Sequence, residues 1–407
     1  MSQFVVNDPV YGFVSVPRGL LCELINHPAF QRLSRIRQLG MSALVYPGAT
    51  HTRWAHSLGA YHLMREAFRS LKEKGVFVFD VEEEGAEIAI LLHDIGHGPF
   101  SHVLEHTLIE HLSHEEITRA LMRRLNREFG GALGMAIQIY SDEYPKRFLH
   151  QLICSQLDTD RLDYLCRDSF YTGVREGNIG AARLIKMLSV ADDRLVVEGK
   201  GLYSVENYLM ARRLMYWQVY LHKTAVAAEE MLRAALERAK ELTRGGVRLF
   251  ASPQLEYFLR SEVQTSHFEE DEECINHFLN LNDSDILCAL GVWQHSEDAV
   301  LSALAGGFVN RRLFKADIFE GNVSGEALDD CREQVAAQSH IPLEATRYFV
   351  RRRIVPKEMY SANAEGIKVQ MPDGAIADVS DVSHIVRGEA VTMEEGRTYV
   401  FHPEWKQ

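Results

Sequence analysis

Histidine is concentrated in one stretch of this chain, and an adjacent histidine and aspartate lie within it. Nine of the 18 histidines fall between His51 and His114. His93 and Asp94 end the apolar run 86–92, which is too hydrophobic for a surface helix and is predicted to cross the core. A buried carboxylate beside a buried imidazole costs several kcal/mol, roughly, unless a cation or another partner satisfies it. We therefore interpret the pair as part of a metal site.

Two adjacent residues cannot complete a coordination shell, so other segments must supply further ligands. His56, just before a helix-like stretch, and Asp160 are the candidates. Together with His93 and Asp94 they offer two imidazoles, two carboxylates and no thiolate. We expect this donor set to hold one divalent metal ion, which is Fe, Mn, Zn, Co, Ni or Mg. Positions left open in the coordination shell would admit water and a substrate oxygen.

The residues around these candidates form a longer set of motifs. They are Asn7-Asp8-Pro9, Phe30-Gln31-Arg32-Leu33, Gln38-Leu39-Gly40, Tyr46-Pro47-Gly48-Ala49, His56-Ser57-Leu58-Gly59, His93 to His102, Asp158 to Asp168 and Tyr220-Leu221-His222-Lys223. With them the chain resembles the HD-domain phosphohydrolases, and among these the dNTP triphosphohydrolases related to the human SAM-and-HD-domain enzyme. The resemblance covers roughly the first 240 residues well. It concerns the HD core, and we expect no SAM domain.

The resemblance implies roles for individual residues. The metal ligands would be His56, His93, Asp94 and Asp160. The catalytic group would comprise His97, His102, His114 and Glu115, with Glu105 standing where the relatives have an aspartate. The triphosphate would be held by Arg53, His97, Arg161 and Arg212, where Arg161 replaces a lysine. A guanidinium suits this task because it binds two phosphate oxygens at once.

The sugar would be recognised by a second group of residues. By resemblance, Gln38 and Asp168 contact its 3'-hydroxyl, Leu39 and Tyr220 press on it and exclude a 2'-hydroxyl, and Tyr164 completes the wall. The implied reaction is metal-dependent hydrolysis of a dNTP to deoxynucleoside and triphosphate. The residues by themselves support only metal-assisted phosphoester hydrolysis. Two alternatives stay open, another HD phosphohydrolase such as a nucleoside monophosphatase or phosphodiesterase, and a nucleotide-sensing or nucleic-acid-binding module with vestigial chemistry.

An activating nucleotide is a further implication of the resemblance. In the relatives it sits between subunits, and the matching residues are Asn7, Asp8, Gln31, Arg311 and Lys315. Asn26 and Ser34 depart from the pattern, since the relatives have an acid and an arginine there. Activation by a guanine nucleotide is therefore not expected, and a different activator or none stays open. A solvated basic turn explains Arg311 and Lys315 equally well. We expect a homo-oligomer, a dimer or a tetramer.

Helical spacing indicates which side chains lie together. Asp160, Tyr164 and Asp168 recur every four residues and share one helix face, with Arg161 one step round. By the same reasoning Arg212, Tyr220 and Lys223 share a face of a long helix over 205–242. We interpret Asp158 and Asp163 as solvated charges. Residues Arg213, Trp217 and Leu221 are expected to pack or to face solvent.

The fold class follows from the helical pattern up to about residue 300, which includes a predicted helix over 145–167. We predict a mainly α protein with an HD-domain core over 1–245 and a smaller α+β region over 246–407, divided at Gly245-Gly246. Predicted strands are 348–350, 367–369 and 398–401. A net charge of -13 argues against a nucleic-acid partner. We expect no membrane segment, and six cysteines without paired spacing indicate a reduced, cytoplasmic protein.

Overall fold

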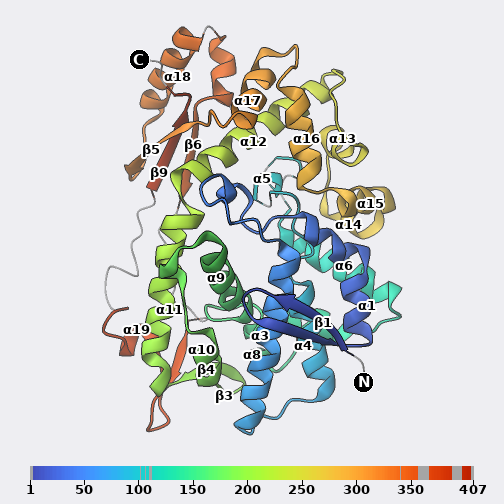
Figure 1. The fold of residues 1–407 in the computed structure, drawn as a ribbon, viewed down its shortest axis with the longest axis vertical. Helices are drawn as coiled ribbons and strands as arrows, with labels where there is room; N and C mark the ends of the chain where they lie inside the picture. Colours follow the sequence, from blue (N-terminus) through green and yellow to red (C-terminus); the bar gives the residue numbers. More distant parts are fainter. Residues whose placement is uncertain are drawn as a thin grey trace.

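The computed structural model describes residues 3–100, 102–105, 107–109, 112–339, 341–355, 366–386 and 397–404. It confirms a mainly helical protein with a smaller α+β part (Figure 1). In this view the helices that carry the metal-ligand candidates occupy the lower part, and most of the C-terminal helices and one sheet occupy the upper part. None of the described helices is long and apolar enough to cross a membrane.

Three helices form the centre of the lower part. They are α3 (Arg53–Glu73), α4 (Asp80–Leu92) and α9 (Thr159–Thr172), and α3 packs against both of the others. The run 86–92 of α4 is buried throughout, as its composition predicted. Because α4 ends at Leu92, His93 and Asp94 begin the loop after it. This places both polar residues at the end of a buried helix.

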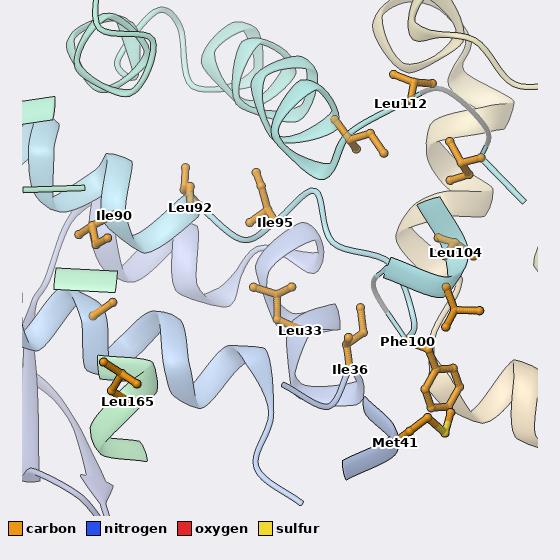
Figure 2. Close-up of a cluster of buried hydrophobic side chains, with 14 of the residues drawn as sticks. Leu33, Ile36, Met41, Ile90, Leu92, Ile95, Phe100, Leu104, Leu112 and Leu165 are labelled. Carbon is orange, nitrogen blue, oxygen red and sulfur yellow. The ribbon is translucent and has the colours of Figure 1, made fainter. Parts of the chain in front are cut away.

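The remaining helices of residues 1–244 surround this centre, except the last of them, which continues into the upper part of Figure 1. They are α1 (Leu20–Asn26), α2 (Pro28–Gln31), α5 (His102–Glu105), α6 (His114–Glu128), α7 (Gly134–Tyr140), α8 (Arg147–Gln151), α10 (Ala181–Met187), α11 (Leu202–Met215) and α12 (Lys223–Arg244). Short 3-10 turns lie at η1 (Arg32–Arg35), η2 (Gly40–Leu44), η3 (Arg175–Gly177) and η4 (Gly199–Gly201). Residues from α2, the turn after it, α4 and α6 pack together with α9 in the shared core, part of which Figure 2 shows.

Two long predicted helices are broken in the structure. The pattern over 145–167 divides because α8 ends at Gln151 and α9 begins only at Thr159. Asp158 caps α9, since its carboxylate accepts a hydrogen bond from the Arg161 N–H, and such caps define helix starts. The pattern over 205–242 changes at η5, a π-helix (Tyr216–Tyr220), and restarts after His222, which caps α12.

The C-terminal part contains five further helices before its first strand. These are α13 (Pro253–Arg260), α14 (Thr265–Glu270), α15 (Glu272–Asn280), α16 (Asp283–Trp293) and α17 (Ala299–Val309). Beyond them lie β5 (Lys315–Glu320), α18 (Gly325–Ser339), η6 (Leu343–Tyr348), β6 (Arg351–Val355), β7 (Lys368–Gln370), β8 (Ile376–Asp378), α19 (Val379–Val382) and β9 (Arg397–His402). The predicted strand at 348–350 is wrong, because the chain becomes extended only at Arg351. The other two predicted strands overlap β7 and β9.

Two hairpins were not predicted from the sequence. They are β1 (Gln3–Asp8) with β2 (Gly12–Pro17), and β3 (Leu188–Ala191) with β4 (Arg194–Glu198). The second hairpin joins the C-terminal part, since β4 pairs in parallel with β7 and the sheet order is β3-β4-β7-β8. The third sheet has the order β5-β9-β6. The expected division at Gly245-Gly246 lies just after the end of α12 and stays a prediction.

Candidate active site

Three of the four predicted metal ligands meet at one point. His56 Nε2 lies 3.2 Å from His93 Nε2, and Asp160 Oδ1 lies 3.0 Å from the first nitrogen and 3.4 Å from the second. These atoms come from α3, the end of α4 and the first turn of α9. The fourth, Asp94, lies at the edge of the group, with one oxygen 3.4 Å from His93 Nε2 and the other 3.9 Å from His56 Nε2.

The hydrogen bonds of the two Nδ1 atoms determine whether the two Nε2 atoms can bind a metal ion. His93 Nδ1 lies 2.6 Å from the carbonyl oxygen of Ile90, which only accepts, so Nδ1 must donate. His56 Nδ1 lies 2.7 Å from an Asp163 oxygen. When Nδ1 carries the proton, Nε2 of a neutral ring presents a lone pair. Two lone pairs at 3.2 Å beside a carboxylate fit a shared divalent cation, and such outer bonds are typical of metal-binding histidines.

Asp163 anchors His56 from behind and is itself anchored. Its carboxylate accepts two hydrogen bonds from Arg167, at 2.9 Å and 3.0 Å, and Arg167 also pairs with Asp8 at 2.8 Å. Burial raises the pKa of Asp163, but Arg167 and His56 outweigh it and hold the pKa below its ordinary value. These buried hydrogen bonds link Asp8 of β1, through Arg167 and Asp163 of α9, to His56 of α3.

The interpretation of Asp158 and Asp163 as solvated charges is therefore wrong. Asp163 is completely buried and Asp158 is 2% exposed. The reason is that each has partners close by, an imidazole and a guanidinium for Asp163 and two backbone N–H groups for Asp158. Gly59 of α3 permits the approach of α9, since a Cβ at this position would lie 2.0 Å from Asp163 Oδ1.

Charge at the metal-ligand cluster is balanced by two imidazoles and a guanidinium. Arg53 donates to Asp94 at 2.6 Å. Burial raises the pKa of Asp94, but Arg53 and the neighbouring histidines outweigh it and lower the pKa well below its ordinary value. For His56 burial acts in the other direction and lowers the pKa, but its hydrogen bonds to Asp160 and Asp163 raise the pKa to about 10. Both shifts show that the carboxylates favour positive charge at this point of the site.

Beside this cluster lies a second group of acid–base residues. The rings of His97 and His114 stack with centroids 3.8 Å apart, and Glu105 lies 2.9 Å from His114 Nδ1 and 3.8 Å from His97 Nδ1. His97 Nε2 also lies 3.3 Å from Asp94. Gly96 allows α6 to approach, because a Cβ there would lie 2.0 Å from the His114 carbonyl oxygen.

Two of the expected catalytic residues are not part of this group as described. Glu115 is exposed on the first turn of α6, and the carboxylate that contacts His114 is that of Glu105 instead. The helix start explains this, because consecutive residues on a helix point about 100° apart. The His102 side chain lies outside the described residues. Its role stays a prediction.

A cavity of about 340 Å³ adjoins the metal-ligand cluster. All eight residues predicted to bind substrate line it, namely Gln38, Leu39, Arg53, Arg161, Tyr164, Asp168, Arg212 and Tyr220. Arg53 links the two regions, since it lines the cavity and bonds to Asp94. Gln38 Oε1 is buried and, within the described part of the chain, has no hydrogen-bond partner. A bound molecule that donates a hydrogen bond would satisfy this atom.

Some residues of the site were not found from the sequence. Arg213 and Tyr216 also line the cavity, although Arg213 was expected to pack or face solvent. Arg213 lies three residues before Tyr216 and seven before Tyr220, a spacing that places the three side chains on one helix face and could have revealed them. Arg32 is completely buried and donates to the carbonyl oxygens of Ile95 and His97, which fixes the loop after Asp94.

The expected activator residues do not meet within one copy of the chain as described. Asp8 is buried against Arg167 and caps the turn of the N-terminal hairpin. Arg311 donates to the Leu44 carbonyl, and Lys315 pairs with Glu404. Asn7 is exposed on β1, and Gln31 is half-buried. An activator site between subunits stays a prediction.

Comparison with known proteins agrees with this geometry. The HD domain family model matches residues 53–166, which contain all four ligand candidates, and the HD associated region model matches 179–252. The protein YwfO of Bacillus subtilis is 36% identical over 325 residues, which are 78% of this chain and 72% of YwfO. A SAMHD1 homolog of Dictyostelium discoideum, described as a deoxynucleoside triphosphate triphosphohydrolase, is 25% identical over 86% of this chain and 71% of its own length.

A solved structure extends the comparison to the whole chain. The crystal structure of a phosphohydrolase from Bacteroides thetaiotaomicron matches with a TM-score of 0.94 at 50% identity, covering 99% of this chain and 100% of that one. The chain belongs to the HD-domain family of phosphohydrolases. Its cluster of His56, His93 and Asp160 is the candidate site for the divalent metal that such a fold binds.

Proposed function

We propose that this protein is a metal-dependent dNTP triphosphohydrolase that cleaves a dNTP to deoxynucleoside and triphosphate. The observation that carries the proposal is the cavity itself. Arginines line it beside the metal-ligand cluster, and Leu39, Tyr164 and Tyr220 line it together with two hydrogen-bonding side chains. A monophosphatase needs the cluster alone, whereas three guanidiniums suit a polyphosphate.

The arginines are held in place before a substrate arrives. Arg53 is fixed by Asp94, and Arg212 donates to Gln156 at 2.8 Å. Arg161 donates through Nε to the Ser155 carbonyl and to Asp158. Each guanidinium has five N–H donors, so Arg161 and Arg212 keep further donors for phosphate oxygens. Preorganised donors of this kind stabilise charge that develops in the transition state.

The reaction needs a nucleophile at the α-phosphorus and a proton for the leaving 5'-oxygen. A divalent ion bound by His56, His93 and the aspartates would polarise a phosphoryl oxygen and lower the pKa of a bound water. The oxygen of a water molecule forms the new P–O bond and the water gives up a proton, while the bond to the 5'-oxygen breaks and that oxygen takes up a proton. Glu105 accepts from His114 Nδ1, and we assign the delivery of this proton to Nε2 of the same ring.

Product identification tests the proposal directly. Metal-loaded protein is incubated with each dNTP singly and in mixture, with NTP and dNMP as controls, and products are separated by chromatography and phosphorus NMR. Intact triphosphate with deoxynucleoside is the expected result. Orthophosphate from monophosphates alone would instead assign the site to another HD phosphohydrolase reaction and refute the proposal.

A variant at His114 tests the proton donor. His114→Ala is expected to bind dNTP normally and to lower kcat by about 100-fold or more, the usual contribution of a general acid. Arg123→Ala is the matched control, because Arg123 lies on the same helix and pairs with the exposed Glu269. Turnover of His114→Ala equal to that of the control would remove His114 from the mechanism.

A further inference from the structure

His51 lies just before α3 and is packed between the cavity wall and α9. Its Nε2 is 2.7 Å from Asp168 Oδ1, and the two side chains are 0% and 2% exposed. The ring stacks on Tyr171 with centroids 4.5 Å apart. The chain before it also packs closely on α9, since a Cβ at Gly48 would lie 2.6 Å from the Tyr171 carbonyl oxygen. His51 is therefore held from two sides.

His51 contacts both hydrogen-bonding residues at this end of the cavity. Its carbonyl oxygen accepts from the Gln38 N–H at 3.0 Å, and its ring bonds to Asp168. Gln38 and Asp168 both line the cavity. One residue thus sets the position of the Gln38 backbone and the orientation of the Asp168 carboxylate.

The bonds around Asp168 determine what it can do for a ligand. Tyr220 donates to Asp168 Oδ2 at 2.8 Å, while His51 approaches Oδ1. A carboxylate only accepts, so His51 donates from Nε2, and a neutral ring is sufficient for this. A carboxylate has about four acceptor positions, and two are taken. The remaining ones, beside the unsatisfied Gln38 Oε1, make this part of the wall an acceptor of hydrogen bonds.

We propose that His51 is a positioning residue that makes the site specific for a substrate with a 3'-hydroxyl, by holding Asp168 as an acceptor. This inference rests on the proposed function, because the 3'-hydroxyl is the one sugar hydroxyl that a dNTP possesses. A 2',3'-dideoxy analogue lacks the donor and leaves two buried acceptors unsatisfied. Sites built to bond a hydroxyl reject analogues without it strongly for this reason.

Two substitutions separate the hydrogen bond from the packing. His51→Phe keeps an aromatic ring against Tyr171 and removes the donor to Asp168. His51→Gln removes the ring and retains an N–H group at similar reach. The assay compares kcat/KM for a dNTP and for the corresponding 2',3'-dideoxynucleotide. Metal content and melting temperature are measured alongside, because a purely structural role would alter these instead.

The wild type is expected to prefer the dNTP strongly. In His51→Phe this preference should fall by about tenfold or more, chiefly through the KM for dNTP, while the bound metal is unchanged. His51→Gln should retain most of the preference. If His51→Phe does not fold, His51→Asn provides the same test, since its shorter amide does not reach Asp168.

Each contrary result has a distinct meaning. An undiminished preference in a folded His51→Phe or His51→Asn protein refutes the role of His51 and leaves the proposed function intact. Equal hydrolysis of dNTP and dideoxynucleotide by the wild type also refutes it, since no 3'-hydroxyl is then read. No hydrolysis of any dNTP refutes the proposed function, and the inference fails with it.

Discussion

Replacing Asp163 by asparagine removes one charge from behind the metal ligands and keeps the size of the side chain. In the native protein Asp163 Oδ2 accepts from His56 Nδ1 at 2.7 Å and from Arg167 Nε at 2.9 Å, and Oδ1 accepts from Arg167 Nη2 at 3.0 Å. Asparagine keeps one acceptor oxygen. Its NH₂ group must then face a donor, because both neighbours donate.

Two effects of Asp163→Asn are expected, and they have different sizes. Removing one partner of a buried ion pair costs about 3–5 kcal/mol, so the free energy of unfolding of the metal-free protein should fall by about this amount. Removing the outer hydrogen bond of a metal-binding histidine lowers metal affinity by about 10–100-fold. The second effect is specific to the position of His56.

The assay combines metal competition with denaturant unfolding. Wild type and variant are equilibrated with a chelator of known affinity, the bound metal is counted by mass spectrometry, and unfolding is monitored by circular dichroism. Asp8→Asn is the matched control, because it breaks the other ion pair of Arg167 but does not contact His56. It should lower stability and leave metal affinity almost unchanged. Wild-type metal affinity in Asp163→Asn would refute the assigned role of Asp163.

Two further predictions concern stability. Burial raises the pKa of Glu87 from 4.5 to about 7. The folded state therefore binds the Glu87 proton more tightly than the unfolded chain. The stability that this proton contributes is lost as pH rises from below 4.5 to above 7. Glu87→Gln should remove this loss of about 3 kcal/mol, so its free energy of unfolding should fall less than that of the wild type between pH 4 and pH 8. An equal fall in the two proteins would contradict the prediction. Gly59→Ala should destabilise the protein by about 3 kcal/mol or more and reduce bound metal, because the new Cβ meets Asp163. The control Gly85→Ala meets the flexible Met135 side chain and should cost less stability in the same thermal melts. Equal losses of stability in the two variants would contradict this prediction.

The metal-ligand candidates could be found from the sequence because their signals are local. An apolar run ending in His93-Asp94 has to be buried, and the spacing of Asp160, Tyr164 and Asp168 places them on one face of a helix. The misreading of Asp163 has the opposite origin. One of its two partners, His56, lies 107 residues away, and no local pattern reveals such a contact. The one local signal was Arg167, four residues later.

The shape of the cavity wall also depends on a feature that periodicity does not contain. The pattern over 205–242 is that of one helix, and a period of 3.6 residues places Arg213 on the same face as Tyr220, seven residues later. The π-helix at 216–220 adds a residue to one turn, which shifts every later side chain around the axis. Such turns are frequent at functional sites. Here the irregular turn lies at the cavity, where Tyr216 and Tyr220 form part of the wall.

The charges around the two metal-binding histidines explain why Asp8 belongs with this site although it lies on the N-terminal hairpin. Apart from His97 and Glu105, the connected groups are two guanidiniums and four carboxylates, namely Arg53, Arg167, Asp8, Asp94, Asp160 and Asp163. With both imidazoles neutral, two negative charges remain, which is the charge that one divalent cation neutralises. A buried cluster with this excess is costly unless a cation joins it. Asp8→Asn and Asp163→Asn remove the same charge, but only the second removes a bond to a ligand. An equal loss of metal affinity in the two would show that total charge, rather than the orientation of His56, determines binding.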